Sequence, residues 1–229
     1  MDRRINRRTI TAGLGLVALG AAAPWRVLAD APQNDISPDA ALRRLMDGND
    51  RFVAGKSMTR DPVAGRAATA KAQYPIAAIL GCADSRAAPE TVFDQGIGDL
   101  FVVRIAGNYL DTDNLASLEF AVAVLKVPLI VVLGHSSCGA VKAAVAEITD
   151  PQPLPGHIWD IADAVRPGIE AVVKAGGDLD RAIGANVDYN VARIAAAQPV
   201  LAEAVKAGRI KVAGGVYDLA SGRVAMHGA

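Results

Sequence analysis

Three scarcities in this sequence exclude several classes of protein. Aromatic residues make up only 4% of the 229 residues, which disfavours a stacking platform for nucleic-acid bases or sugars. The net charge is zero, because 24 Lys and Arg balance 24 Asp and Glu, so a nucleic-acid binder driven by phosphate contacts is not expected. Only two cysteines occur, Cys82 and Cys138, so the chain is not a disulfide-dense scaffold.

Apolar residues, in contrast, are plentiful enough for a folded protein. They form 52% of the chain, and the mean hydropathy is +0.25, which excludes disorder over the chain as a whole. A chain of this size buries roughly 70% of its unfolded surface on folding, so it needs no covalent staple for stability.

The first thirty residues have the pattern of a secretory signal. Four arginines form a positive head, and the apolar run 10–23 that follows is too short to cross a bilayer of about 30 Å as a helix, which disfavours an uncleaved anchor. Small side chains at 27–29 predict cleavage after Ala29. The pair Arg7 and Arg8 resembles a twin-arginine signal.

The sequence therefore predicts a signal peptide at 1–29 and one folded domain at 30–229. Removal of the signal takes away five Arg and one Asp, which leaves 19 basic and 23 acidic side chains and a net charge of −4. We expect a periplasmic or secreted protein, exported by the twin-arginine route, that makes no membrane contact after cleavage.

The pattern of the mature chain predicts an α/β fold. Stretches with helical spacing, at 114–125, 138–148 and 178–197, alternate with apolar runs that lack polar alternation and should be buried strands. These runs are 76–80, 100–105, 129–133 and 210–216. We expect a single domain with a central, mostly parallel sheet of four strands, an edge strand at 224–227 and helices on its faces.

An N-terminal helical arm precedes the predicted sheet. Ser37 and Pro38 are typical of a helix start, and Gly55 is typical of a helix end. Apolar residues recur at helical spacing between them, and residues 56–72 predict a loop with a short helix.

Polar segments follow two of the predicted strands at the point where each strand ends. The segment 81–86, Gly-Cys-Ala-Asp-Ser-Arg, follows the run 76–80, and 134–139, Gly-His-Ser-Ser-Cys-Gly, follows 129–133. Because the carboxyl ends of parallel strands lie at one edge of a sheet, we expect both segments to meet there.

Two thiolates and one imidazole then form a ligand set that suits zinc: Cys82, His135 and Cys138. Three protein ligands leave a fourth position open, where a metal-bound water with its pKa lowered to about 7 supplies hydroxide. The alternative is a structural Cys82–Cys138 disulfide, worth about 4 kcal/mol in the chain-entropy model. His135, one turn before Cys138, favours the metal. His157 and His227 have no partners nearby in sequence and are not expected as ligands.

Asp84 and Arg86 stand two and four residues after Cys82 and are close enough to pair. A carboxylate held by arginine can accept the hydrogen bond of a metal-bound hydroxide and orient it. Asp84 could instead fill the fourth metal position and close the site, and the spacing permits either. An ordinary surface salt bridge is the third reading of such a pair.

The two polar segments together resemble the zinc motifs of the β-class carbonic anhydrases. The resemblance covers about residues 37–224, with further matches at 48–52, 98–108, 117–122, 154–167 and 215–218. It implies a zinc lyase, with one Zn²⁺ per chain, that hydrates carbon dioxide reversibly to bicarbonate and a proton. It also implies a homodimer or homotetramer, built through the N-terminal arm and the sheet edge.

The resemblance assigns roles to single residues as well. It makes the three residues named above the zinc ligands and makes Asp84 and Arg86 the catalytic dyad. Gln73 stands where similar enzymes use a glutamine of the dimer mate to bind substrate, and Phe101 would line the apolar carbon dioxide pocket. Closed-site members often carry Trp three residues before the first Cys; Ile79 stands there, which favours an open site.

Two other functions remain compatible with the sequence. The same scaffold could hydrolyse carbon disulfide or carbonyl sulfide, which related family members use. A non-catalytic periplasmic zinc-binding protein, locked by Asp84, is the other. Replacement of Asp84 by Asn separates enzyme from locked site, because only the enzyme would lose its rate and keep its zinc.

Overall fold

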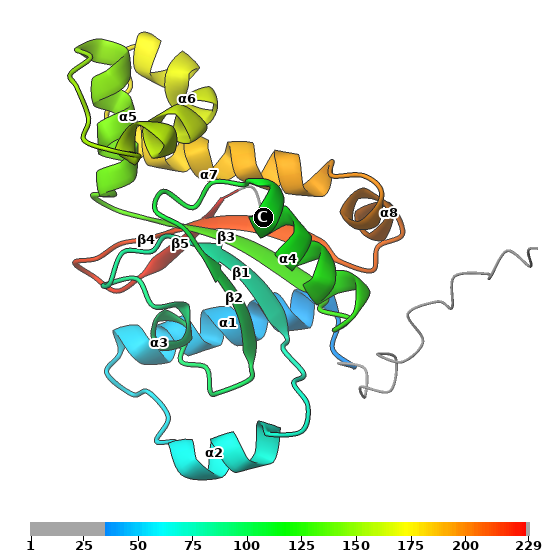
Figure 1. Cartoon of the computed structure of the whole chain (residues 1–229). Helices are drawn as coiled ribbons and strands as arrows, with labels where there is room; N and C mark the ends of the chain where they lie inside the picture. Colours follow the sequence, from blue (N-terminus) through cyan, green and yellow to red (C-terminus); the bar gives the residue numbers. More distant parts are fainter. Residues whose placement is uncertain (1–34, 228–229) are drawn as a thin grey trace, which may run out of the picture. The chain divides into compact units, whose positions relative to one another are not determined.

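The computed structural model describes residues 35–227, and the predicted signal peptide lies outside the described residues. A five-stranded sheet runs through this part of the chain (Figure 1). Its strands are β1 (Ala77–Gly81), β2 (Leu100–Arg104), β3 (Leu129–His135), β4 (Lys211–Tyr217) and β5 (Val224–His227). Their order is β2-β1-β3-β4-β5, with the first four parallel and β5 antiparallel to β4. The predicted mostly parallel sheet with an edge strand is confirmed.

Burial differs between the central and outer strands. All residues of β1 and β3 are buried, as their unbroken apolar sequences predict. The same prediction is wrong for β2, in which only Leu100 is buried and Arg104 is exposed. β2 is an outer strand with β1 as its single neighbour, so one of its edges has no partner strand within the described chain.

Helices cover both faces of the sheet. The side chains of Ala77 and Ile79 point to the face covered by α1 (Pro38–Val53) and α3 (Pro89–Val92). Ala78 and Leu80 point to the other face, which α4 (Thr112–Ala123), α7 (Leu179–Ala195) and α8 (Val200–Lys206) cover. This is the alternation that a strand requires, with both of its faces dry.

A third apolar cluster lies beyond the carboxyl ends of the strands. It joins α5 (Gly139–Thr149), α6 (Ile158–Lys174) and α7, which lie together at the top of Figure 1. The sequence reading did not predict α6, which carries Pro167 and Gly168 inside it. A Cβ on Gly168 would lie 3.1 Å from the Tyr189 side chain, so the glycine allows α6 to approach α7 closely.

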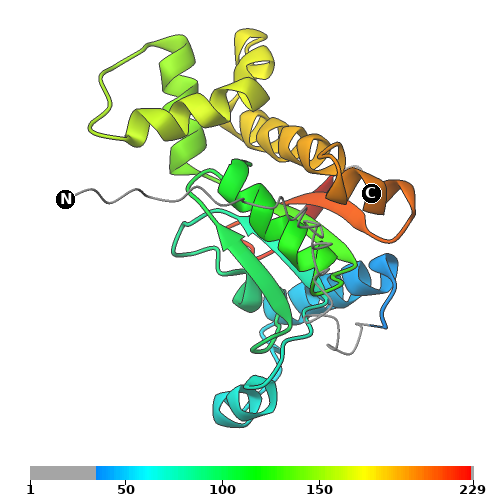
Figure 2. The same cartoon turned by 45° about the vertical axis from the view of Figure 1, so that its right-hand side comes forward.

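The helix α2 (Pro62–Thr69) confirms the short helix expected within 56–72, and none of its residues is buried. Figures 1 and 2 both show it set apart from the sheet. Buried Asp94 fixes the chain before α2, since its carboxylate accepts hydrogen bonds from Arg51 Nε at 2.6 Å, Arg60 Nη1 at 2.5 Å and the Met58 N–H at 3.2 Å.

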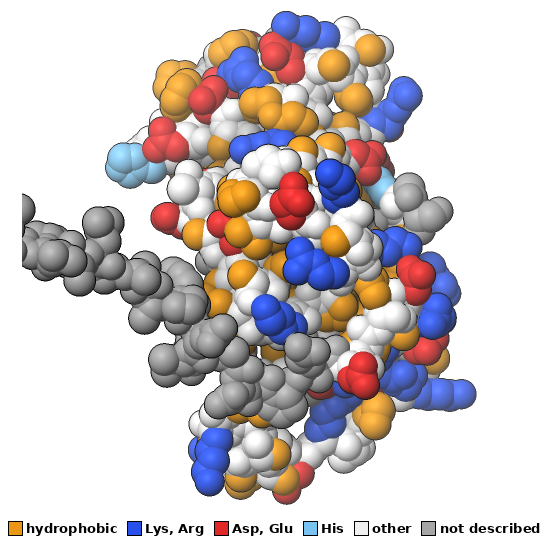
Figure 3. Space-filling model, turned by 90° about the vertical axis from the view of Figure 1, so that its right-hand side faces the viewer, with side chains coloured by type: hydrophobic (Ala, Val, Ile, Leu, Met, Phe, Trp, Pro, Cys, Tyr) orange, Lys and Arg blue, Asp and Glu red, His pale blue; other side chains and the backbone are white. Residues whose placement is uncertain are grey.

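The surface is mixed in character. On the face shown in Figure 3, basic and acidic side chains lie interspersed with apolar ones. Within residues 35–227 no helix has the length and apolar character needed to cross a membrane.

The arm helix α1 is tied to the sheet by one buried amide, that of Asn49, which is 1% exposed. Ser37 caps the start of this helix, as predicted, by accepting the Ala40 N–H at 3.2 Å. Asn49 Nδ2 donates to the carbonyls of Val92 at 3.0 Å and Gly222 at 2.8 Å, and Asn49 Oδ1 accepts the Val224 N–H at 2.9 Å.

We expect Asn49→Ala to lower the free energy of unfolding by about 2–4 kcal/mol, because three backbone groups, two of them in buried bonds, lose their partners. Urea denaturation followed by circular dichroism measures the change. Asp50→Ala is the matched control: its carboxylate is 72% exposed and lies 3.8 Å from Arg223, so its loss should change stability by less than about 0.5 kcal/mol. Equal effects of the two variants would contradict this account.

Candidate metal centre

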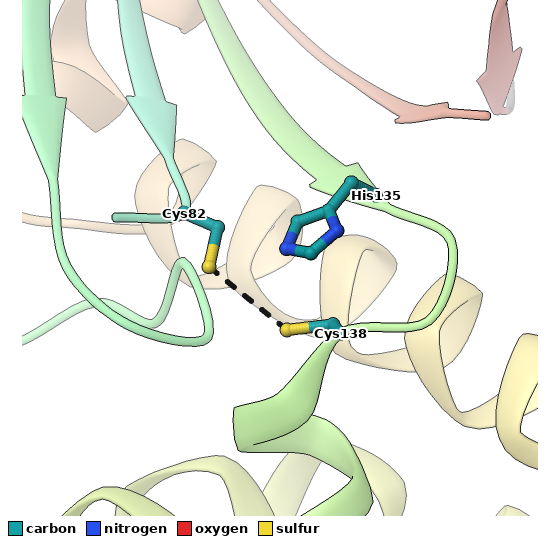
Figure 4. Close-up of side chains that lie close together, drawn as sticks. All are labelled: Cys82, His135 and Cys138. Atoms are coloured by element: carbon teal, nitrogen blue, oxygen red, sulfur yellow. Dashed lines mark hydrogen bonds between the residues drawn. The ribbon is translucent and has the colours of Figure 1, made fainter. Parts of the chain in front are cut away.

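Three potential metal ligands meet where β1 and β3 end (Figure 4). Cys82 directly follows β1, His135 is the last residue of β3, and Cys138 is the N-cap of α5. Their ligand atoms all lie within 4.8 Å of one another, and the three residues are at most 4% exposed. The parallel pairing of Gly81 with Leu133 brings the two strand ends to one level.

The geometry of this cluster fits a tetrahedral zinc ion. The two sulfur atoms are 3.9 Å apart, close to the ~3.8 Å expected for two thiolates at about 2.3 Å from one tetrahedral zinc. Both cysteines are free, so they form no disulfide. His135 Nδ1 lies 3.0 Å from the Ser136 carbonyl, while Nε2 is buried without a hydrogen-bond partner in the described residues. Buried polar atoms rarely stay unpaired, so this nitrogen is suited to a metal.

The local electrostatics favour a thiolate at Cys82. The hydrogen bond from the Cys138 thiol lowers the pKa of Cys82 most strongly, against the effect of burial, and the Gly107 N–H contributes at 3.3 Å. Burial tends to lower the pKa of His135, but the contact with Cys82 outweighs it and raises that pKa. Thiolate is the form in which cysteine binds metals.

Asp84 lies beside the cluster and is held by Arg86. Arg86 donates from Nε to Asp84 Oδ1 at 2.9 Å and from Nη2 to Oδ2 at 2.7 Å. This two-pronged contact holds the pKa of Asp84 well below its usual range, so the carboxylate is ionised at neutral pH. Asp84 Oδ2 also lies 3.8 Å from His135 Nε2. The structure thus places Asp84, paired with Arg86, next to the three possible metal ligands.

The sequence reading missed a second arginine at this edge. Arg104, the last residue of β2, donates from Nε to the Cys82 carbonyl at 2.9 Å and from Nη2 to the Asp84 carbonyl at 2.6 Å. It fixes the backbone between Cys82 and Asp84. The carboxyl ends of parallel strands lie at one edge of a sheet, and β2 is one of these strands. The same expectation could therefore have pointed to Arg104.

Two further predicted residues lie away from the three ligands. Gln73 is exposed in the segment between α2 and β1 and makes no hydrogen bond within the described residues. Phe101 is half-buried on β2, with its ring centroid 6.3 Å from that of Phe120 on α4. Within residues 35–227 the group of Cys82, His135 and Cys138 is the only one of three or more possible ligands that converges.

The other histidines have partners of their own. His157 Nδ1 lies 3.0 Å from the Asp160 carboxylate at the start of α6, with a side chain that is 99% exposed. His227 Nδ1 lies 3.0 Å from the Asp188 carboxylate, which joins β5 to α7.

Comparison with known proteins points to one family. The family model described as carbonic anhydrase matches residues 77–224. The chain is 45% identical over 190 residues to a carbonic anhydrase of Mycolicibacterium smegmatis, covering 82% of this chain and 92% of that protein. It is 43% identical over 192 residues to carbonic anhydrase 2 of Mycobacterium tuberculosis, covering 83% and 93%.

Solved structures agree with the sequence relatives. The β-carbonic anhydrase of Coccomyxa, in complex with acetazolamide, matches with a TM-score of 0.64 at 29% identity, over 85% of this chain and 86% of that one. One of two tetrameric β-carbonic anhydrases of Sordaria macrospora matches with a TM-score of 0.65 at 25% identity, over 82% and 97%.

We expect one zinc per chain and two reactive thiols after denaturation in a chelator. Elemental analysis and thiol titration measure both on the same sample. After zinc removal, an oxidant should close the Cys82–Cys138 disulfide, because the sulfurs need to move only from 3.9 Å to about 2.05 Å. His157→Ala serves as control and should keep its zinc. Zinc-free protein with an intact disulfide, as isolated, would count against the metal centre.

Proposed function

The chain belongs to the β-class carbonic anhydrase family, and on that premise we propose that it catalyses the zinc-dependent, reversible hydration of carbon dioxide to bicarbonate and a proton. The observation that carries this function is the buried group of Cys82, His135 and Cys138, with an ionised Asp84 beside it. These three residues would hold the zinc ion through two thiolates and one imidazole nitrogen.

A zinc ion held there would supply hydroxide near neutrality, because it would lower the pKa of a bound water to about 7. Asp84 is ionised and can therefore only accept hydrogen bonds. It would accept the hydrogen bond of the attacking hydroxide, which would leave a lone pair of that oxygen directed at the carbon of the substrate. Arg86 holds the carboxylate in this orientation through two parallel hydrogen bonds.

The site is open in this proposal, with the fourth metal position free for reaction. For Asp84 to become the fourth ligand, its carboxylate would have to leave Arg86 and turn toward the sulfurs. That movement costs two charge-assisted hydrogen bonds, and the clamp of Arg104 on the carbonyls of Cys82 and Asp84 opposes a change of the backbone.

A homodimer or homotetramer completes the active site. Support comes from the described surface: β2 is an outer strand, α2 has no buried residue, and three apolar side chains near them are exposed, Val63 at 61%, Ile97 at 55% and Phe120 at 40%. A second copy would cover these side chains. Exposed Gln73 would then serve the partner's site, where its amide can bind substrate, while Phe101 lines the apolar pocket.

The enzyme acts in the periplasm, where residues 1–29 direct it by the twin-arginine route. That route carries folded proteins, so zinc can be loaded before export. The metal then occupies both thiolates and protects Cys82 and Cys138 from oxidation to a disulfide in the new compartment.

We expect Asp84→Asn to keep its zinc and to lose activity roughly 10- to 100-fold, because the amide can turn a donor toward the attacking oxygen. Stopped-flow carbon dioxide hydration at pH 7.5 and 9 measures the rate, with zinc determined on the same sample. Asp84 has a lowered pKa and stays ionised at both pH values, so the wild type should be fast at both. Asp160→Asn, on an exposed carboxylate, is the control and should keep the rate.

Other outcomes of this experiment decide against the proposal. Wild-type activity at pH 9 only would show a site closed at neutral pH. Zinc-loaded protein that hydrates no carbon dioxide at either pH would exclude the proposed reaction and direct the search to carbon disulfide or carbonyl sulfide.

We expect replacement of Arg7 and Arg8 together by Lys to keep the protein in the cytoplasm, because the twin-arginine receptor reads that pair. Cell fractionation measures the distribution, and mass spectrometry of the periplasmic form should place its N-terminus at Asp30. The same change at Arg3 and Arg4 is the matched control, since it also keeps the positive charge. Unchanged export of the first variant would mean that the general secretory route is used.

A further inference from the structure

Ser136, the residue after the ligand His135, is hydrogen-bonded on three sides. Its N–H donates to the Tyr217 carbonyl at 2.9 Å, and its Oγ accepts the Leu219 N–H at 2.9 Å. Its carbonyl oxygen lies 3.0 Å from His135 Nδ1. Ser136 therefore connects the metal-ligating imidazole with the chain that follows β4.

That chain, the β4–β5 turn (residues 218–223), is braced internally. The Asp218 N–H donates to the Arg223 carbonyl at 2.8 Å, and the Gly222 N–H donates to the Asp218 carbonyl at 2.9 Å. Asp218 Oδ1 accepts the N–H and hydroxyl of Ser221 at 2.7 and 2.6 Å. These bonds lower the pKa of Asp218, and the Ser136 hydroxyl contributes in the same direction. These hydrogen bonds hold the turn in one conformation against Ser136.

Contacts with α1 fix the β4–β5 turn to the core of the protein. Asn49 of α1 binds the Gly222 carbonyl and the Val224 N–H, and its amide is buried. The Tyr217 ring, 5% exposed, packs 6.5 Å from that of Phe52 on the same helix. A continuous set of contacts thus runs from α1 through the β4–β5 turn and Ser136 to His135.

The contact between Ser136 and His135 decides which nitrogen can face the metal. A neutral imidazole carries one N–H, and a carbonyl next to Nδ1 accepts only a hydrogen on that atom. The free electron pair then lies on Nε2, the atom left without a partner next to the two sulfurs. If the carbonyl shifts, both the tautomer and the direction of the ring are less well defined.

We propose that Ser136 is a positioning residue of the metal centre: its hydroxyl holds the β4–β5 turn against the end of β3, which fixes the carbonyl that orients His135 toward zinc. The inference rests on the zinc site of the proposed function and is independent of the substrate. The Ser136 hydroxyl would act on the metal only through the backbone and the imidazole of His135.

The test compares three variants of the zinc-loaded enzyme. Ser136→Ala removes the acceptor of the Leu219 N–H, and Ser136→Thr keeps it. Ser137→Ala is the matched control, since the Ser137 side chain is exposed and makes no hydrogen bond within the described residues. Zinc transfer to the chromogenic chelator 4-(2-pyridylazo)resorcinol measures zinc release, and the absorption bands of the Co²⁺-substituted protein report the ligand geometry.

We expect Ser136→Ala to release zinc about 10- to 100-fold faster than the wild type, with shifted Co²⁺ bands. Ser136→Thr should restore both measurements, and Ser137→Ala should match the wild type. The restoration separates positioning of the ligand from a general loss of packing. Wild-type release and spectrum in Ser136→Ala would overturn the proposal.

A fourth variant keeps the test decisive if Ser136→Ala does not fold. Ser221→Ala changes an exposed residue and removes one of the bonds that brace Asp218. It should speed zinc release in the same direction by a smaller factor, and unchanged release would again contradict the proposal. A protein that binds zinc but hydrates no carbon dioxide would overturn the proposed function alone, because zinc release does not depend on the reaction.

Discussion

The register between β1 and β3 is the constraint on which the metal centre depends. The two strands run parallel side by side, with Gly81 opposite Leu133, so that each carries its polar segment past the same edge of the sheet. Cys82 then faces His135 across a short gap, and Cys138, the N-cap of α5, lies beside both of them. A shift of one residue in this pairing would turn the apolar side chains to the wrong faces and separate the ligands.

The ligands are held by more than their own strands. Arg104 fixes the carbonyls around Cys82 from β2, Gly107 donates its N–H to the sulfur, and Ser136 supports His135 from the side of β4. Arg104 ends β2, Gly107 lies in the loop after β2, and Leu219, which donates to Ser136, lies in the turn after β4. The bond from Gly107 to the sulfur is buried, and a polar group removed from water must keep its partner. The centre is therefore a product of the whole sheet edge and not of the three ligands alone.

The predictions from the sequence were accurate where the local pattern of apolar and polar residues was strong. Unbroken apolar runs identified β1 and β3 correctly, and the polar segments after them contain the three possible ligands that converge in the structure. The reading of β2 as a fully buried strand was wrong, since an apolar run does not say whether a strand has one neighbour or two. It also left out α6, where Pro167 and Gly168 interrupt the helical pattern. The contacts of Arg104 and Ser136 join residues that are far apart in the chain, so no local pattern contains them.

The sequence by itself determined the kind of chemistry and the layer architecture. Two cysteines and one histidine at the ends of apolar runs specify a thiolate and imidazole ligand set, and alternating strand and helix patterns specify a parallel sheet. Only the tertiary structure decided the distances, the free Nε2 of His135 and the pairing of Asp84 with Arg86 beside the ligands. The physical reason is that residue types and periodicity are local properties, whereas strand order and register are set by packing of the whole domain.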